Sequence, residues 1–156
     1  DTEIDELHQN GVQLRFIGNL DGLADSLQKK MAYAREHTSA NTGLILNLAV
    51  NYGGRAEVVH AVQCLAREVQ KGVMTPEAIT ESHIHNYLYT AGLPDPDLII
   101  RPSGDQRISN FLLWQSAYAE MVYQEKLFPD FDRRDLWDAC LEYASRDRRF
   151  GGVKPR

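Results

Sequence analysis

The sequence contains little cysteine, and this scarcity excludes several classes of site. Only Cys64 and Cys140 occur in the 156 residues, far apart and without a CxxC or Cys/His spacing. Structural zinc sites and redox-active dithiols depend on such spacings. We therefore expect no zinc or redox chemistry, and we expect both residues to be buried thiols of a protein from a reducing cytosol.

Long hydrophobic runs and an excess of positive charge are also absent. No apolar run approaches the roughly 20 residues that a membrane-spanning helix needs, and residues 1–10 carry no signal-peptide pattern. These absences predict a soluble, cytoplasmic protein. The net charge of -5 argues against a general nucleic-acid binder, which needs surplus Lys and Arg facing the phosphates. Any anion site must therefore be local.

The composition that is present is typical of a soluble globular protein. Hydrophobic residues make up 43% of the chain and charged residues 25%, so a packed core is expected and disorder is not. A length of 156 residues suits one ordinary domain. The sequence shows no internal linker or repeat, and we predict a single α/β domain over residues 1–156.

Hydrophobic patterning predicts strands that alternate with helices. Strands are expected at residues 12–17, 44–50, 97–101 and 120–123, and helices at 20–34, 58–69, 80–92, 110–118 and 133–147. The last helix is expected to have Asp132 as its cap and to turn Leu136, Cys140 and Tyr143 to the core. This order predicts an α/β fold with a central, mostly parallel sheet flanked by helices.

Two polar, glycine-bearing loops follow predicted strands, at residues 51–55 and 101–109. In parallel sheets, ligands gather beyond the carboxyl ends of the strands. The second loop contains Arg101, Arg107 and Ser109. Two fork-shaped guanidinium groups, a hydroxyl and free helix-terminal amides are what a diphosphate requires, because its charge is spread over several oxygens.

The alternative for this loop is structural. Arg101 and Arg107 could be surface residues paired with Asp97 and Asp105, since exposed ion pairs are common. Residue composition alone leaves both interpretations open.

Glu120 is the candidate metal ligand. It begins a predicted strand, where its carboxylate is expected to point toward the same sheet edge and could hold magnesium beside a bound phosphate. The alternative is an ordinary exposed glutamate.

Other polar clusters carry no comparable signal. The segment NYGGR at residues 51–55 lacks the spacing of a dinucleotide fingerprint and the Gly-Lys-Ser of a nucleotide loop. His83 and His85 lie two apart on a predicted helix, so they do not share a face. No Ser/His/Asp or Cys/His grouping is visible, which leaves proton transfer and charge stabilisation as the available chemistry.

Several segments resemble the cis-prenyltransferases of the undecaprenyl diphosphate synthase type. The string DLIIRPSGDQRISNFLLWQSAYAE at residues 97–120 resembles the signature block of that family. NYGGR at 51–55, LFPDF at 127–131 and RRFGG at 148–152 also match, in the family's order. The resemblance covers nearly the whole chain and implies the family's α/β fold.

The resemblance implies roles for the residues already selected. Arg101, Arg107 and Ser109 would grip the diphosphate of isopentenyl diphosphate, with the backbone near Ile108 helping, and Glu120 would ligate magnesium as the cofactor. Asp105 stands where the family often has glutamate, which keeps the charge but changes the reach.

The resemblance also implies partners. Arg149 and Gly151 match a terminal Arg-x-Gly that reaches a neighbouring subunit's site in the family dimer, so Arg149 is a further candidate substrate-binding residue and a homodimer is expected. The substrates would be isopentenyl diphosphate and an allylic diphosphate such as farnesyl diphosphate. The product would be a polyprenyl diphosphate for a cell-wall lipid carrier, with peripheral membrane contact during its release.

Two family features are missing from this sequence. The family begins with an aspartate-glycine-asparagine-glycine-arginine-tryptophan loop, which supplies a magnesium aspartate and holds the allylic diphosphate, and it later adds a serine-rich stretch with a catalytic asparagine. Neither occurs here. We therefore expect a C-terminal section that lacks the family's N-terminal strands, contains no catalytic residue of its own and is inactive alone.

A non-catalytic partner subunit and a simple phosphate-binding module are the alternatives. A non-catalytic subunit would be expected to lose the substrate loop. This chain keeps Arg101, Arg107, Ser109 and Glu120, which favours the enzyme.

Overall fold

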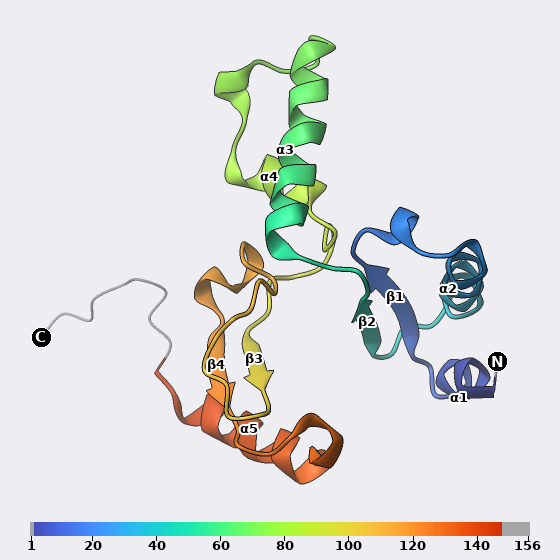
Figure 1. Ribbon diagram of the computed structural model, residues 1–156, viewed down its shortest axis with the longest axis vertical. Coiled ribbons are helices and arrows are strands. Elements are labelled where there is room, and N and C mark those ends of the chain that lie inside the picture. The colour runs from blue at the N-terminus through green and yellow to red at the C-terminus, as the bar shows by residue number, and fades with distance from the viewer. Residues whose placement is uncertain (1, 148–156) are drawn as a thin grey trace, which may run out of the picture. The chain divides into compact units, whose positions relative to one another are not determined.

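The computed structural model describes residues 2–147, which fall into two compact units that are divided between Gly92 and Leu93. Each unit contains its own pair of parallel strands (Figure 1). The predicted α/β class with parallel strands agrees with both units. The prediction that residues 1–156 form one domain stays a prediction.

The first unit is built around a βαβ crossover. Its strands β1 (Gln13–Ile17) and β2 (Ile45–Ala49) pair in parallel from Gln13 opposite Ile45 to Ile17 opposite Ala49. The helices of this unit are α1 (Thr2–Gln9), α2 (Asp25–His37), α3 (Gly54–Gln70) and α4 (Glu81–Tyr87). The predicted strands 12–17 and 44–50 are confirmed to within a residue at each end.

Helix α2 packs on β1 through a small core. Met31 and Ala34 of α2 and Leu14 of β1 are buried. Thr38, at the end of α2, is also fully buried, and its hydroxyl donates to the carbonyl of Ala34 at 2.8 Å and accepts from the amide of Leu14 at 2.9 Å. Because the polar group is satisfied on both sides, its burial costs little. The helix begins at Asp25, later than predicted, since Leu20–Gly22 forms a separate 3-10 turn.

The second unit contains β3 (Leu98–Arg101), β4 (Glu120–Tyr123) and α5 (Arg133–Ser145). The two strands pair in parallel from Leu98 opposite Glu120 to Arg101 opposite Tyr123, and α5 packs against β4. The predicted helix over 110–118 is wrong. Asn110 and Leu112 have positive φ angles of 62° and 46°, which a right-handed helix forbids, and only a 3-10 turn at Gln115–Tyr118 forms.

The start of α5 confirms Asp132 as its cap. The Asp132 carboxylate accepts from the amide of Arg134 at 2.7 Å, and the Asp135 carboxylate accepts from the Asp132 amide at 2.6 Å. This capping box satisfies two amides that have no helical partner. The predicted core face is wrong in part, because Ala139 is the buried residue of α5 and Leu136 is 48% exposed. Cys64 and Cys140 are free and half-buried, so the prediction of two buried thiols is also wrong.

Acid should weaken this cap. A hydrogen bond from Lys126 at 2.8 Å, and then the Asp132 amide, hold the pKa of Asp135 below its usual range. A lowered folded-state pKa adds stability at neutral pH that is lost as the pH falls below roughly 4. The stability difference between wild type and Asp135→Asn should therefore shrink between pH 7 and pH 3 in thermal unfolding. A difference that does not change with pH would contradict this assignment.

No helix within residues 2–147 is long and apolar enough to cross a membrane.

Candidate functional site

Arg101 ends β3 and organises the loop that follows it. Its Nη1 donates to the carbonyl oxygen of Arg107 at 2.6 Å and to the Ser109 hydroxyl at 2.9 Å. The side chain is only 24% exposed, so these bonds hold it in a defined place. The structure thus brings Arg101, Arg107 and Ser109 together as predicted from their positions in the sequence. Their part in binding stays a prediction.

Asp105 lies between the two arginines. One of its carboxylate oxygens accepts from Nη2 of Arg101 at 3.2 Å and from Nη2 of Arg107 at 2.6 Å. The pairing with Asp105 that the structural alternative required is therefore present. It does not exclude an anion site, because the Arg107 side chain is still 66% exposed and open to solvent.

The backbone of the loop is fixed at its start. Ser103 and Gly104 have positive φ angles of 88° and 71°. Their amides donate to the carbonyls of Lys126 and Gln124, both at 2.8 Å, so the loop is tied to the segment that follows β4. A left-handed conformation favours glycine, which explains Gly104 at this turn.

A cavity of about 170 Å³ lies beside the loop. Its polar part is lined by Arg101, Arg107 and Ser109. Apolar residues of both strands and the loop line the rest: Ile99, Ile100, Ile108, Phe111 and Met121. A cavity with few convergent polar groups and an apolar wall is typical of a site for a small molecule with one charged end.

Glu120 is not among the residues that line this cavity. It pairs with Leu98 at the start of the strand pair, whereas Arg101 pairs with Tyr123 at the other end. The structure therefore does not bring Glu120 together with the arginine loop, and its part in holding a metal stays a prediction.

The Glu120 carboxylate instead meets α5. It accepts from Nη1 of Arg146 at 2.7 Å, and Nη2 of Arg146 bonds to Glu142. These hydrogen bonds, first that of Glu120 and then that of Glu142, raise the pKa of Arg146 above its usual value. Arg149 lies outside the described residues, so the structure says nothing of its predicted role.

A buried carboxylate that sequence reasoning missed follows directly after the turn at residues 51–55. Glu57 is fully buried in the first turn of α3, where it accepts from the Tyr52 hydroxyl at 2.5 Å and from the Tyr89 amide at 2.7 Å. Burial, and then the charge of Glu57, raise the pKa of Tyr89. Glu57, Ala61 and Leu65 are spaced by four residues, and this spacing is the sequence signal that could have placed Glu57 on the buried face.

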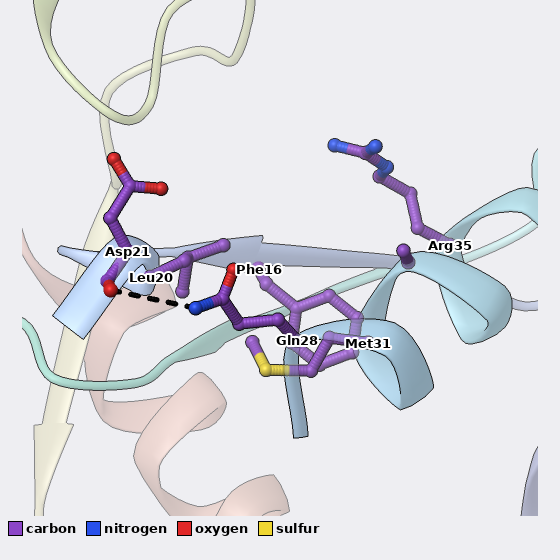
Figure 2. A pocket seen from close by; sticks show the side chains of 7 residues that line it. Phe16, Leu20, Asp21, Gln28, Met31 and Arg35 are labelled. Carbon is purple, nitrogen blue, oxygen red and sulfur yellow. Dashed lines mark hydrogen bonds between the residues drawn. The ribbon is translucent and has the colours of Figure 1, made fainter. Parts of the chain in front are cut away.

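A second depression, of about 200 Å³, lies in the first unit (Figure 2). Phe16, Leu20 and Met31 form its apolar floor, and the side chains of Asp21 and Arg35 stand at its two ends. Nε2 of Gln28 donates to the backbone oxygen of Asp21 at 3.4 Å. None of the predicted site residues lines this depression.

The parallel strands and the arginine loop define an α/β protein with a candidate site for a phosphorylated small molecule. Comparison with known proteins then gives the family. The family described as "Putative undecaprenyl diphosphate synthase" matches residues 1–151. The chain belongs to this family, as the motifs at 51–55 and 97–120 predicted.

Curated relatives carry names from the same family. The chain is 54% identical over 151 residues to isoprenyl transferase 1 of Streptomyces coelicolor, with 97% of this chain and 54% of that protein covered. It is 52% identical over 149 residues to decaprenyl diphosphate synthase of Mycobacterium bovis, with 96% and 50% covered. The chain thus spans about half the length of these relatives.

Solved structures give the same fold. Lavandulyl diphosphate synthase from Lavandula x intermedia, solved in complex with dimethylallyl diphosphate, matches with a TM-score of 0.92 and 40% identity over 96% of this chain and 65% of that one. A probable undecaprenyl diphosphate synthase from Campylobacter jejuni matches with a TM-score of 0.82 and 34% identity over 97% and 68%. The predicted fold class is confirmed.

Proposed function

We propose that this chain carries the isopentenyl diphosphate site of a cis-prenyltransferase, which condenses isopentenyl diphosphate onto an allylic diphosphate such as farnesyl diphosphate. The observation that carries the proposal is the convergence of Arg101, Arg107 and Ser109 on one cavity with an apolar wall. The names of the relatives, among them isoprenyl transferase and decaprenyl diphosphate synthase, support the same reaction class.

The loop residues have separate tasks in this proposal. The guanidinium groups of Arg101 and Arg107 bind the diphosphate through charge-assisted hydrogen bonds, and the Ser109 hydroxyl adds one more. The apolar side chains of Ile99, Phe111 and Met121 surround the isopentenyl group and exclude water from its double bond. This double bond then attacks the allylic carbon as the bond from that carbon to its diphosphate breaks and inorganic diphosphate leaves, and loss of a proton to the released diphosphate forms the new cis double bond.

Glu120 offers suitable chemistry for the implied magnesium. Mg²⁺ is usually bound by one or two protein carboxylates, and waters and substrate phosphates complete its coordination. Within residues 2–147 there is no group of three or more metal-ligating side chains, so Glu120 would supply one ligand of a shared site. Magnesium, when bound, neutralises charge on a diphosphate.

The assembly and cellular role are part of the proposal. The terminal Arg-x-Gly, with Arg149, supports a homodimer in which that segment reaches a neighbouring subunit's site. We place the enzyme in the cytoplasm, with peripheral membrane contact when a long polyprenyl product for a cell-wall lipid carrier is released.

A fusion tests the activity. Joined to the preceding section of Streptomyces coelicolor isoprenyl transferase 1, the chain should convert radiolabelled isopentenyl diphosphate and farnesyl diphosphate to a cis-polyprenyl product. The 156 residues alone should give none, because the aspartate-glycine-asparagine-glycine-arginine-tryptophan loop is absent from them. A folded fusion without product, or turnover by the chain alone, would count against the proposal.

Arg107→Ala in the active fusion should raise the KM for isopentenyl diphosphate by about tenfold, or roughly 1.4 kcal/mol, with much less change for farnesyl diphosphate. Arg107→Lys keeps the charge but loses the planar fork, so an intermediate KM is expected. Unchanged isopentenyl diphosphate kinetics in a folded Arg107→Ala protein would instead favour the surface ion-pair interpretation.

A further inference from the structure

The depression shown in Figure 2 has an apolar floor that three elements of the first unit build together. Phe16 comes from β1, Leu20 from the 3-10 turn and Met31 from α2. Met31 is only 6% exposed, and Phe16 and Leu20 are half-buried. An apolar cavity of about 150 Å³ can hold a molecule the size of benzene. At about 200 Å³, this depression therefore has room for one ring or a short alkyl chain.

Gln28 gives the depression a fixed polar rim. Its Nε2 donates to the backbone oxygen of Leu23 at 2.8 Å and to that of Asp21 at 3.4 Å, so the amide joins α2 to the segment before it. Within residues 2–147 no hydrogen bond is made to Oε1 of Gln28. This oxygen is therefore an acceptor that is open to a ligand and is held in place by the bonds of its own amide nitrogen.

Opposite charges stand at the two ends of the depression. Asp21 and Arg35 are both exposed, and their charged groups lie on the same side of the apolar floor in Figure 2. Among the described residues neither side chain has an ion-pair or hydrogen-bond partner. Gln28, which is bonded to the Asp21 end, lies two helical turns before Arg35, a rise of roughly 10 Å along α2. The two ends are therefore too far apart to bind charges that a ligand carries on one carbon atom.

We propose that this depression binds a small zwitterion whose ammonium and carboxylate groups are separated by an apolar middle. The Asp21 carboxylate and Oε1 of Gln28 accept hydrogen bonds from the ammonium, and the Arg35 guanidinium donates to the carboxylate. The middle of the ligand packs on the apolar floor. A few convergent polar groups around an apolar wall are typical of a small-molecule site. No residue of the arginine loop lines this depression, so its ligand is bound independently of isopentenyl diphosphate.

Titration with 4-(aminomethyl)benzoate tests the proposal, because this compound carries its charges at opposite ends of one ring. The chain has three methionines, Met31, Met74 and Met121, so labelling their methyl groups with ¹³C gives three nuclear magnetic resonance signals. Met31 reports on this depression and Met121 on the cavity beside the arginine loop. The probe should shift the Met31 signal with a Kd of roughly 1–10 mM, as expected for a ligand of its size, and leave the other two in place.

Three related compounds separate charge recognition from apolar contact. Phenylglycine is an isomer of the probe that has both charges on one carbon, benzylamine lacks the carboxylate, and benzoate lacks the ammonium. Each should bind about three- to fivefold more weakly than the probe, because each loses a contact to one of the two exposed charges.

Charge-removing variants assign the two ends of the depression. Asp21→Asn should weaken the binding of the probe and of benzylamine by about three- to fivefold and leave benzoate unchanged. Arg35→Gln should weaken the probe and benzoate by a similar factor and leave benzylamine unchanged. Asp25→Asn and Lys30→Gln are the matched controls, because they remove the same charges from exposed positions of α2 that do not line the depression. Both should keep the Kd of the probe within about twofold, since solvent and salt screen charges that are not in contact.

Two results would overturn the proposal. One is a dispersed spectrum in which the Met31 signal stays in place at probe concentrations several times this Kd. The other is a Met31 signal that responds equally to the probe and to phenylglycine, or that keeps its full response in both charge variants, since the depression would then bind apolar groups without recognising charge. A shift of all three methionine signals would likewise show non-specific contact.

Discussion

Arg101→Ala should weaken the binding of isopentenyl diphosphate to the chain by at least about thirtyfold, measured by titration calorimetry. The variant loses a ligand for the diphosphate and also the bonds that Arg101 makes to the Arg107 carbonyl and the Ser109 hydroxyl, which shape the loop. Each hydrogen bond to a charged group contributes about 1.5–3 kcal/mol, so losing one ligand and its supports exceeds the effect of losing Arg107 alone.

Arg101→Lys separates charge from geometry. Lysine keeps the positive charge but cannot donate to Arg107, Ser109 and Asp105 from one planar group, so most of the loss should remain. Circular dichroism of both variants shows whether β3 and its unit stay folded. A folded Arg101→Ala protein with wild-type affinity would show that the loop is not the binding site.

Glu57→Ala should lower the free energy of unfolding by about 2–4 kcal/mol in urea titrations. The side chain is fully buried, and its removal leaves the Tyr52 hydroxyl and the Tyr89 amide without their acceptor. Both groups lie in the first unit, so the loss should appear in probes of α3 and α4.

Glu57→Gln is the milder control. Its amide oxygen can still accept one of the two hydrogen bonds, so the cost should be smaller than that of Glu57→Ala. Equal stability of wild type and Glu57→Ala would contradict the assignment of Glu57 as the acceptor that joins the 51–55 turn to the end of α4.

Much of the fold could be predicted because the strands have strong local signals. The alternation at 12–17, the apolar run at 44–50 and the glycine turn before α3 each allow few alternatives, and a parallel pair follows from strands separated by a helix. The arginine loop was predicted for a similar reason. Its charged residues lie close together in sequence directly after a short apolar strand.

The errors come from features that depend on tertiary contacts. The pattern at 110–118 predicted a helix, but Asn110 and Leu112 have positive φ angles that nothing local in the sequence predicted. The place of Glu120 relative to the arginine loop depends on its register with Leu98, which a single strand does not specify. The two hydrogen bonds that Asp105 accepts, from Arg101 and from Arg107, likewise depend on how the loop folds.

Nuclear magnetic resonance of the ¹⁵N-labelled 17.7 kDa chain, titrated with isopentenyl diphosphate, tests the central claim most directly. We expect the largest shifts at the amides of Arg107, Ile108 and Ser109 and at the guanidinium Nε of Arg101, and small shifts elsewhere in the chain. A well-dispersed spectrum in which saturating isopentenyl diphosphate leaves these signals in place, or moves a different cluster, would contradict the account.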